Sequence, residues 1–525
     1  MKRGFGAFGT AFARALSRVV PLVDRDLTMQ DIYQVSATEL ARRVREGELR
    51  SIDLVDACIA AIERVNPALN AVVATRFREA RNEAHAADQK LKDVGPTKVG
   101  PLHGVPCSIK ESFALTGMPN TSGLRARVGL LADADATAVA RLRAAGAIPL
   151  GVTNTSELCM WMESSNRVYG RTNNPYALDR IVGGSSGGEG AIIASGAVPF
   201  GLGSDVGGSI RMPAFFNGIF GHKASSALVP NTGQFPITQG EGLRYLATGP
   251  MARHAEDLWL LLDILKGPDG ADEICEERAL PHPDTVDLST LRVMSVETNH
   301  LRRPSRALRH AQRDALERLA PLVDSVAHTD IPEFRKSPLY WGAMLGSSPG
   351  PSFAEMLGVT GLRAVGQELF ELLRGRSSHT LPAIALALLD GPNTPRGKRT
   401  QRAIIEGRRF RDSLNETLGE DGVMLFPSYP SVAPKHHWPQ ARLLDWLYTA
   451  IFNATEMPVT QVPLGLDDNG LPVGVQVVAA HGNDHLCLAV ALALEKAFGG
   501  WQPPERTQSM LEACLDDATT RADTP

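Results

Sequence analysis

Short apolar runs and helical stretches alternate through the middle of this chain. Residues 147–152 and 197–202 are apolar runs of strand length, and residues 136–145, just before the first run, have the pattern of a helix. Alternation of this kind is typical of strands joined by crossover helices. The pattern predicts an α/β fold with a single large mixed, mostly parallel sheet covered by helices.

Helical patterns dominate before and after this stretch. One helix is expected to start at a capping box on Ser36, and a second is expected to start at Ser51. Residues 269–419 are again helical and richer in charge. Strand patterns return at residues 423–426, 459–464 and 473–479. Because late strands can complete an earlier sheet, we expect one domain over residues 31–500.

The two ends of the chain differ from this domain. In residues 1–30, apolar side chains recur at intervals that would gather them on one face of a helix: Phe5, Phe8, Phe12, Leu16 and Val19. Such an amphipathic helix could lie on a membrane surface. The alternatives are a helix docked on the protein itself, a frayed terminus and a signal peptide. Residues 501–525 are expected to be a C-terminal tail, with the last 20 or so residues disordered.

Charge and cysteine usage exclude several classes of protein. A formal net charge of −4 gives no general attraction to nucleic acid or to an anionic membrane. The six cysteines contain no CxxC pair, so we expect neither disulfides nor zinc, and a reducing, cytoplasmic compartment. Arg14 and Arg18 interrupt the uncharged run 4–13 long before the ~20 residues that a membrane-spanning helix needs.

Three segments punctuated by glycine carry the candidate chemistry. They contain Lys110, Ser185 and Ser209, in that order. A lysine and two serines can supply a base, a proton relay and a nucleophile. Glycine allows main-chain N–H groups to approach a developing oxyanion closely. The set predicts a hydrolase that needs neither a metal nor an organic cofactor.

The two serine segments resemble the amidase signature family. The resemblance rests on residues 183–190 (GGSSGGEG) and 203–223 (GSDVGGSIRMPAFFNGIFGHK), with supporting runs at 156–161 and 433–437. It covers roughly residues 30–500, and within the family the chain is most similar to the second type of fatty-acid amide hydrolase. The resemblance implies the amidase signature fold and hydrolysis of linear carboxamides, and of esters, without a cofactor.

The same resemblance implies roles for single residues. Ser209 would attack the substrate carbonyl to form an acyl-enzyme, Ser185 would follow a cis peptide bond and relay the proton, and Lys110 would be the terminal base. Because an ammonium group cannot accept a proton, burial has to hold Lys110 neutral against a reference pKa of about 10.4. The expected oxyanion hole consists of the main-chain N–H groups of Val206, Gly207, Gly208 and Ser209.

Other residues near the serines have supporting or competing roles. Asp205 and Arg211 are expected to hold the Ser209 loop as a buried ion pair, and Ser186 is expected to support the site. A rival interpretation makes Ser186 the nucleophile of a GxSxG elbow. Its partners would be a later aspartate and histidine, Asp467 or Asp468 and His481 or His485.

Two further alternatives concern phosphate and metal binding. The loop 183–188 could cradle a phosphate, but it lacks the GK[ST] ending of a P-loop and the GxGxxG spacing of a dinucleotide site. The histidines at 436–437 and 481–485 could bind a metal, but neither group has an HExxH arrangement or a cysteine cluster. We therefore expect no metal.

The substrate is the least defined part of this interpretation. Apolar residues close to the candidate segments could line an acyl channel or belong in part to the core: Met160, Trp161, Met212, Phe215 and Phe216. We expect a small-molecule amide or ester substrate, no nucleic-acid partner, and peripheral membrane contact or a homodimer as further associations that the sequence allows. The alternatives are the glutaminase subunit of a tRNA-dependent amidotransferase and a catalytically silent lipid-binding protein.

Overall fold

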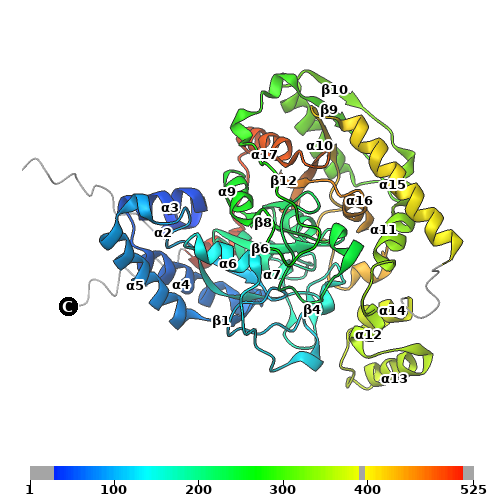
Figure 1. Cartoon of the computed structure of the whole chain (residues 1–525), viewed down its shortest axis with the longest axis horizontal. Helices are drawn as coiled ribbons and strands as arrows, with labels where there is room; N and C mark the ends of the chain where they lie inside the picture. Colours follow the sequence, from blue (N-terminus) through cyan, green and yellow to red (C-terminus); the bar gives the residue numbers. More distant parts are fainter. Residues whose placement is uncertain (1–28, 390–396, 512–525) are drawn as a thin grey trace, which may run out of the picture.

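One sheet of eleven strands organises the part of the chain that this computed structural model describes, residues 29–389 and 397–511 (Figure 1). The strand order is β1-β3-β2-β6-β8-β7-β12-β13-β11-β9-β10. The strands are Val72–Thr75 (β1), Pro106–Lys110 (β2), Ile148–Thr153 (β3), Phe200–Asp205 (β6), Phe220–Lys223 (β7), Ala247–Ala252 (β8), Arg292–Ser295 (β9), Ser325–His328 (β10), Gly422–Phe426 (β11), Val459–Leu466 (β12) and Pro472–Ala479 (β13), beside a separate ribbon of Ser165–Asn166 (β4) and Gly170–Arg171 (β5). The first and last strands along the sequence thus belong to one sheet.

The strand directions correct one part of the predicted fold. The expected single large mixed sheet is confirmed, but within the described residues only four of its pairs are parallel: β2 with β3 and β6, and β9 with β10 and β11. The other six pairs are antiparallel. Short connections explain part of this difference, because residues 467–471 between β12 and β13 are too few for the crossover that parallel strands require.

Helices cover the sheet and both of its ends. In Figure 1, α2 to α5 lie at the β1 end, α10 and α15 lie at the β9–β10 end, and α12 to α14 form a group at one corner. Their bounds are Met29–Gln34 (α2), Ala37–Glu46 (α3), Ser51–Leu69 (α4), Phe77–Val94 (α5), Thr137–Ala144 (α6), Gly187–Ala194 (α7), Arg211–Phe216 (α8), Glu256–Leu265 (α9), Arg306–Leu319 (α10), Ser337–Gly346 (α11), Phe353–Leu357 (α12), Gly361–Leu373 (α13), Leu381–Leu389 (α14), Lys398–Leu418 (α15), Leu447–Ala454 (α16) and Asp484–Phe498 (α17).

Local signals account for several of these boundaries. The Ser36 hydroxyl caps α3 by accepting the Glu39 N–H at 3.0 Å, as the sequence predicts. The Glu39 carboxylate does not complete the capping box, because it pairs with Arg42 and Arg43 on the same helix. The strand expected at 197–202 lies three residues later, as β6. This shift places Ser204 and Asp205 at the end of a strand beside β2.

The chain ends are only partly described. Residues 505–511 form a helix, and the Trp501 indole donates to the carbonyl of Ala194 at 3.1 Å. Leu511 is buried. The expected boundary of the C-terminal tail at residue 501 is therefore too early. Residues 501–511 still belong to the folded domain, because Trp501 and Leu511 are both held against it. The expected amphipathic stripe in residues 1–28 lies outside the described part.

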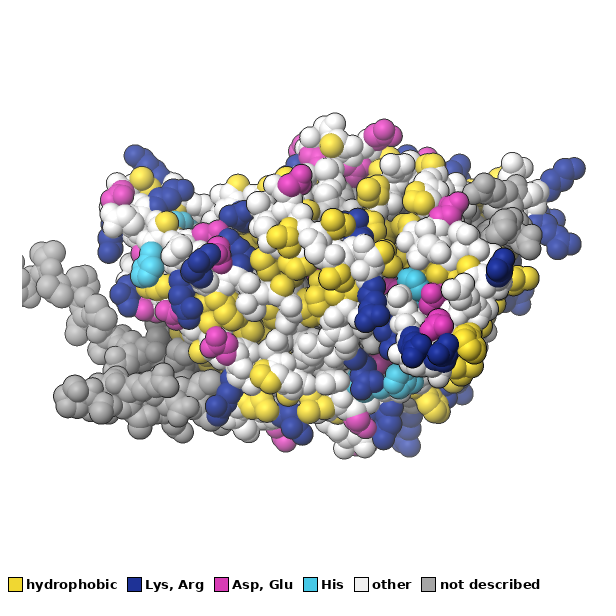
Figure 2. All heavy atoms as spheres, turned by 90° about the horizontal axis from the view of Figure 1, so that it is seen from below, with side chains coloured by type: hydrophobic (Ala, Val, Ile, Leu, Met, Phe, Trp, Pro, Cys, Tyr) yellow, Lys and Arg dark blue, Asp and Glu magenta, His cyan; other side chains and the backbone are white. Residues whose placement is uncertain are grey.

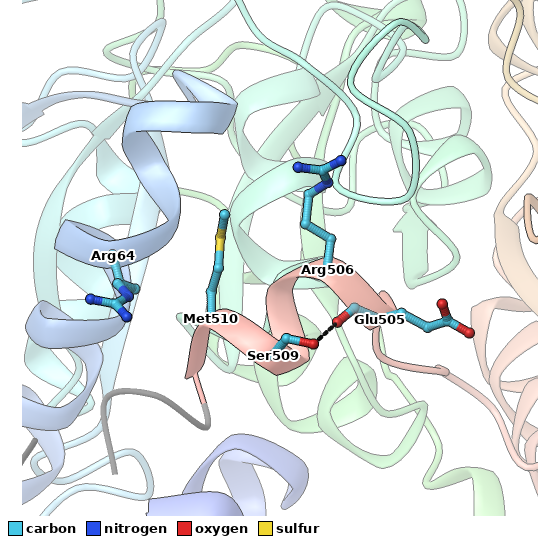
Figure 3. A pocket seen from close by; sticks show the side chains of 5 residues that line it. All are labelled: Arg64, Glu505, Arg506, Ser509 and Met510. Atoms are coloured by element: carbon cyan, nitrogen blue, oxygen red, sulfur yellow. Dashed lines mark hydrogen bonds between the residues drawn. The ribbon is translucent and has the colours of Figure 1, made fainter. Parts of the chain in front are cut away.

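A hollow of about 550 Å³ opens between α4 and the helix at 505–511 (Figure 3). It is lined by Arg64, Glu505, Arg506, Ser509 and Met510. None of the expected site residues contributes to it. Among the helices described, none is both long and apolar enough to span a bilayer.

Candidate active site

The sheet brings the three glycine-punctuated segments together at one edge. Lys110 is the last residue of β2, and Asp205 is the last residue of β6, its parallel neighbour. The carboxyl ends of parallel strands meet at the same edge, where α/β enzymes usually bind ligands. The Ser185 loop leads directly into α7, and the Ser209 loop follows β6 and leads into α8.

Lys110 is buried and hydrogen-bonded to serines on both sides. Its Nζ donates to Ser185 Oγ at 2.7 Å and to Ser204 Oγ at 2.9 Å. Burial lowers the pKa of the Lys110 ammonium, while the side chains of Cys159 and Asp205 oppose this shift in part. The environment of Lys110 therefore favours the neutral amine more than water does.

The two serine loops contact each other through their backbones. The peptide bond between Gly184 and Ser185 is cis. The Ser186 N–H donates to the Ser209 carbonyl at 3.2 Å. Ser209 is the more accessible of the two candidate serines, at 6% exposure against 1% for Ser185. This order suits a nucleophile that meets substrate and a relay that lies behind it.

Close packing explains why glycine is needed at the start of α7. A Cβ on Gly188 would lie 2.4 Å from the backbone nitrogen of Asn154, well inside van der Waals contact. Because the obstacle is backbone, it cannot move aside easily. Gly188 therefore allows α7, and the Ser185 loop before it, to lie directly against the end of β3.

Asp205 and Arg211 form a fully buried ion pair at 2.9 Å. The Asp205 carboxylate also accepts the N–H groups of Gly208 at 2.7 Å and Ile210 at 3.1 Å. Burial alone would raise the pKa of Asp205, but the Arg211 guanidinium outweighs burial and lowers it. An ionised Asp205 therefore fixes the backbone around Ser209 from below.

The expected oxyanion hole needs one correction. The Gly208 N–H already donates to Asp205, so it is not directed at a substrate oxygen. The N–H groups of Val206, Gly207 and Ser209 make no hydrogen bond within the described residues. Gly208 remains essential for shape, because its φ of +120° is a glycine conformation and a Cβ there would lie 2.0 Å from Thr449 Oγ1.

Two tryptophans that were not expected from the sequence cover the loop of residues 206–209, the candidate oxyanion loop. Trp341 on α11 donates its indole N–H to the Val206 carbonyl at 2.7 Å. Its ring stands edge-on to that of Trp446, with the centroids 4.6 Å apart. Both side chains lie close to Gly207 and stay partly exposed. No local motif marks these positions, which lie more than 130 residues beyond the loop; their residue type is the only signal.

The residues expected to line an acyl channel separate into two groups. Phe215 and Phe216 are fully buried, and their rings pack on each other and on Tyr429. They belong to the main apolar core rather than to a channel, in a helix whose residues are all buried. Met160 and Trp161 remain partly exposed.

Met212, at the start of α8, is buried. Its terminal methyl would lie 3.1 Å from a Cβ on Gly208, so it packs under the nucleophile loop.

The structure also contradicts the rival nucleophile elbow. Ser186 is fully buried and its hydroxyl donates to the Ser204 carbonyl at 3.3 Å. Asp467 accepts N–H groups of its own turn, those of Asn469 and Leu471. His481 bonds to the Ser226 carbonyl at 3.1 Å. Within the described residues the Ser186 hydroxyl bonds to Ser204 alone, and not to Asp468 or His485. The described residues contain no cluster of histidine, cysteine and carboxylate groups that could hold a metal.

The comparisons with known proteins place this site in a family. The sequence model of a family described as Amidase matches residues 53–488, which include all three candidate catalytic residues. The chain belongs to the amidase family. This amidase is 45% identical over 521 residues to fatty-acid amide hydrolase 2-A of Danio rerio, with 96% of this chain and 95% of that protein covered. The resemblance noted in the sequence is confirmed, and the chain is an amide hydrolase.

Two more distant relatives show the breadth of the family. Acylamidase of Rhodococcus erythropolis is 30% identical over 502 residues, with 93% of this chain and 100% of that protein covered. The solved structure of 6-aminohexanoate cyclic dimer hydrolase in complex with substrate superposes with a TM-score of 0.76 at 27% identity. The match covers 91% of this chain and 100% of that one. The expected amidase signature fold is confirmed.

Proposed function

We propose that this amidase hydrolyses fatty-acyl or aryl amides, and the corresponding esters, through an acyl-enzyme on Ser209. The observation that carries the proposal is the contact of 2.7 Å between Lys110 Nζ and Ser185 Oγ in a buried site. Burial lowers the pKa of Lys110, as a base at neutral pH requires. The neighbouring Ser209 loop then presents the more accessible hydroxyl to the substrate.

Proton transfer follows the order of these three side chains. Ser209 Oγ attacks the carbonyl carbon, its proton passes to Ser185 Oγ, and the Ser185 proton passes to Lys110 Nζ. The C–N bond then breaks, and the leaving amine takes a proton back along the same relay. Water attacks the resulting ester in a second cycle, which releases the acid and restores Ser209.

Main-chain N–H groups stabilise the oxyanion in this scheme. The N–H groups of Val206, Gly207 and Ser209 are the candidates, because Gly208 is committed to Asp205. Each such donor typically contributes a factor of about 10²–10³ to the rate. The Asp205–Arg211 pair contributes by holding the loop in place before the substrate arrives.

The acyl group is proposed to lie against Trp341 and Trp446. Both rings are apolar, partly exposed and close to Gly207, so they suit an acyl chain that leaves the carbonyl carbon beside Ser209. The Trp161 carbonyl lies against Gly184, so Met160 and Trp161 are proposed to line the side toward Ser185. The fatty-acid amide hydrolases among the relatives support an acyl amide as the substrate class.

Covalent labelling tests the nucleophile. A fluorophosphonate reacts with an activated serine, so Ser209→Ala should abolish both labelling and turnover. Ser186→Ala is the matched control, because it removes the neighbouring hydroxyl from the same loops and should leave a labelled, weaker enzyme. Labelling that persists in Ser209→Ala and disappears in Ser186→Ala would contradict the proposal.

A substrate panel tests the acyl group. Amides with acetyl to long-chain acyl groups, aryl amides and glutamine would be compared by kcat/KM. Preference for long acyl or aryl groups supports the proposal. Preferred release of ammonia from glutamine, together with a tightly bound partner on purification, would instead favour the glutaminase role in an amidotransferase.

Peripheral contact with a lipid surface is proposed for the corner formed by α13 and α14. Leu362, Leu373 and Leu389 are exposed there, Leu373 to 88%. Exposed arginines on α13 and just after it, Arg363 and Arg376, would meet anionic headgroups. Figure 2 shows hydrophobic and basic side chains beside one another on the face seen from below.

Vesicle co-sedimentation separates this surface from the N-terminal stripe. The full chain, a form that starts at Asp24 and a Leu373→Asp variant would be compared on vesicles with and without anionic lipid. Loss of binding in Leu373→Asp alone supports the corner, and loss in the truncated form alone supports the stripe. Equal sedimentation of all three proteins would contradict membrane contact through either surface. A homodimer stays a prediction, which sedimentation equilibrium would test.

A further inference from the structure

Two carboxylates at the ends of one short segment make the same pair of contacts with distant parts of the chain. Glu157 accepts a hydrogen bond from His379 Nδ1 at 2.7 Å and another from the next backbone N–H at 2.8 Å. Glu163 accepts a bond from His436 Nδ1 at 2.7 Å and another from the next backbone N–H at 3.2 Å. The segment between them contains Met160 and Trp161.

Both pairs are buried and held from the other side. The side chains are 2–3% exposed for the two glutamates and 8–9% for the two histidines. The His379 carbonyl accepts from Arg167, and His436 Nε2 lies 3.0 Å from the Leu178 carbonyl. Buried carboxylates with two partners hold their positions firmly, because the loss of either partner leaves polar groups unsatisfied.

The Glu163 end of the segment contacts the Ser185 loop directly. Ser164 Oγ lies 3.1 Å from the carbonyls of Gly183 and Ser185, and it accepts the Gly187 N–H at 3.0 Å. The Trp161 carbonyl lies so close to Gly184 that a Cβ there would be 2.3 Å away. The segment therefore touches the backbone on both sides of Ser185.

The Glu157 end joins the site to the α12–α14 group. His379 and its neighbour lie immediately before α14. Leu158 and Met160 pack in the same apolar cluster as Phe353 on α12 and Ile384 on α14. Leu158 and Cys159 have φ values of 51° and 59°, a left-handed conformation that non-glycine residues keep only where their surroundings hold it.

We propose that residues 157–164 form a brace for Ser185, and that Glu157 and Glu163 are positioning residues with separate effects. This inference rests on the proposed role of Ser185 as the proton relay. The Glu163–His436 pair sets the position of the relay and therefore kcat. The Glu157–His379 pair sets the position of the α12–α14 group against Met160 and therefore the KM of long acyl substrates.

The chain offers a matched control with the same contacts elsewhere. Glu495 on α17 accepts from His254 Nδ1 at 3.2 Å and from the next backbone N–H, that of Ala255, at 3.0 Å. This third pair joins α17 to the start of α9 and touches neither serine loop. Replacement of Glu495 by glutamine thus disrupts a pair with the same pattern of contacts, though a more exposed one, outside the brace.

The experiment compares Glu163→Gln, Glu157→Gln and Glu495→Gln as folded, full-length enzymes. Turnover is expressed per site labelled by fluorophosphonate, so that unfolded protein does not count. Glu163→Gln should lower kcat by ~10-fold or more with little change in KM, because misplaced catalytic groups are costly. Glu157→Gln should raise KM about tenfold for long acyl amides and leave short ones almost unchanged. Glu495→Gln should match the wild type per labelled site.

Ser164→Ala keeps the test decisive if Glu163→Gln fails to fold, since it removes the contact with the Ser185 backbone and leaves both glutamate–histidine hydrogen bonds intact. It should lower kcat without raising KM. Wild-type kinetics per labelled site in both brace variants would overturn the inference, as would equal losses in Glu495→Gln. Labelling at a residue other than Ser209 in the wild type would instead contradict the proposed function.

Discussion

Two regions contribute to the site in different ways. The region from β2 to α8 supplies Lys110 at the end of β2, and Ser185 and Ser209 on loops whose glycines are required by close packing. The region from α11 to α16 supplies Trp341 and Trp446, which cover the oxyanion loop without any local motif. In the proposed function, the first region carries the bond-breaking chemistry, whereas the second region determines which acyl group reaches it.

The largest expected effect tests the chemistry proposed for the first region. Lys110→Ala removes the proposed terminal base, and turnover should fall by about 10²–10⁴-fold because general base catalysis is lost. The fold should persist, since the change removes a buried neutral amine and leaves no buried charge unpaired. Steady-state kcat/KM would measure the loss of turnover, and circular dichroism would show whether the fold persists.

The pH dependence of wild-type activity tests the same role of Lys110. Because burial lowers the pKa of Lys110, activity should rise as pH increases through an apparent pKa below that of free lysine. Lys435→Ala, at an exposed lysine, is the control and should keep the wild-type profile. Near-normal turnover of Lys110→Ala at neutral pH would exclude the base role.

The second prediction concerns the support beneath the nucleophile. Asp205→Asn removes the charge that pairs with buried Arg211 and weakens the bonds to the loop. Breaking a buried pair in this way typically costs about 3–5 kcal/mol in the free energy of unfolding. Chemical denaturation would measure that loss, and fluorophosphonate labelling should slow because the loop relaxes.

A surface pair supplies the control for Asp205. Glu39→Gln breaks the partly exposed contacts with Arg42 and Arg43, and surface pairs contribute only about 0–1 kcal/mol. If Asp205→Asn were no more destabilising than Glu39→Gln, the ion pair would not hold the loop.

The sequence predicts these two regions unequally, for physical reasons. Glycine positions and serine spacing are local, so the catalytic segments and the boundary of α3 at Ser36 could be predicted. Strand direction depends on long-range pairing, so the antiparallel share of the sheet could not. The same limit applies to Trp341 and to His379, whose neighbours are more than 130 residues away in sequence.

Phe215 and Phe216 show the opposite error. They lie close to Ser209 in sequence, and closeness in sequence suggested a channel. The helix that follows Ser209, α8, is buried at every position, so these side chains lie in the core although they are close to the nucleophile in sequence.

The third prediction tests whether the second region determines which acyl group is accepted. Trp446→Ala should enlarge the space beside Gly207 and shift the ratio of kcat/KM values toward bulkier acyl groups by about tenfold, since lost packing is worth ~1–3 kcal/mol. Trp341→Phe keeps an aromatic ring but removes the bond to the Val206 carbonyl, so it should lower kcat several-fold with little change in preference. A uniform loss over all acyl groups in Trp446→Ala would contradict the division.

The smallest expected effect concerns the protonation state of a buried carboxyl group in the first region, that of Glu189. Burial raises the pKa of Glu189 from 4.5 to about 8, although Ser108 and Thr153 both donate to the carboxylate. The folded chain therefore binds this proton more tightly than the unfolded chain does. The resulting stability is complete below about pH 4.5 and is lost as pH rises toward about 8.

Glutamine cannot ionise, so the Tm of Glu189→Gln should decline less than that of the wild type between these two pH values. Glu505→Gln, at an exposed carboxylate, should follow the wild type. Parallel declines in Glu189→Gln and the wild type would show that Glu189 stays ionised, and its negative charge would then act against a neutral Lys110 in the mechanism.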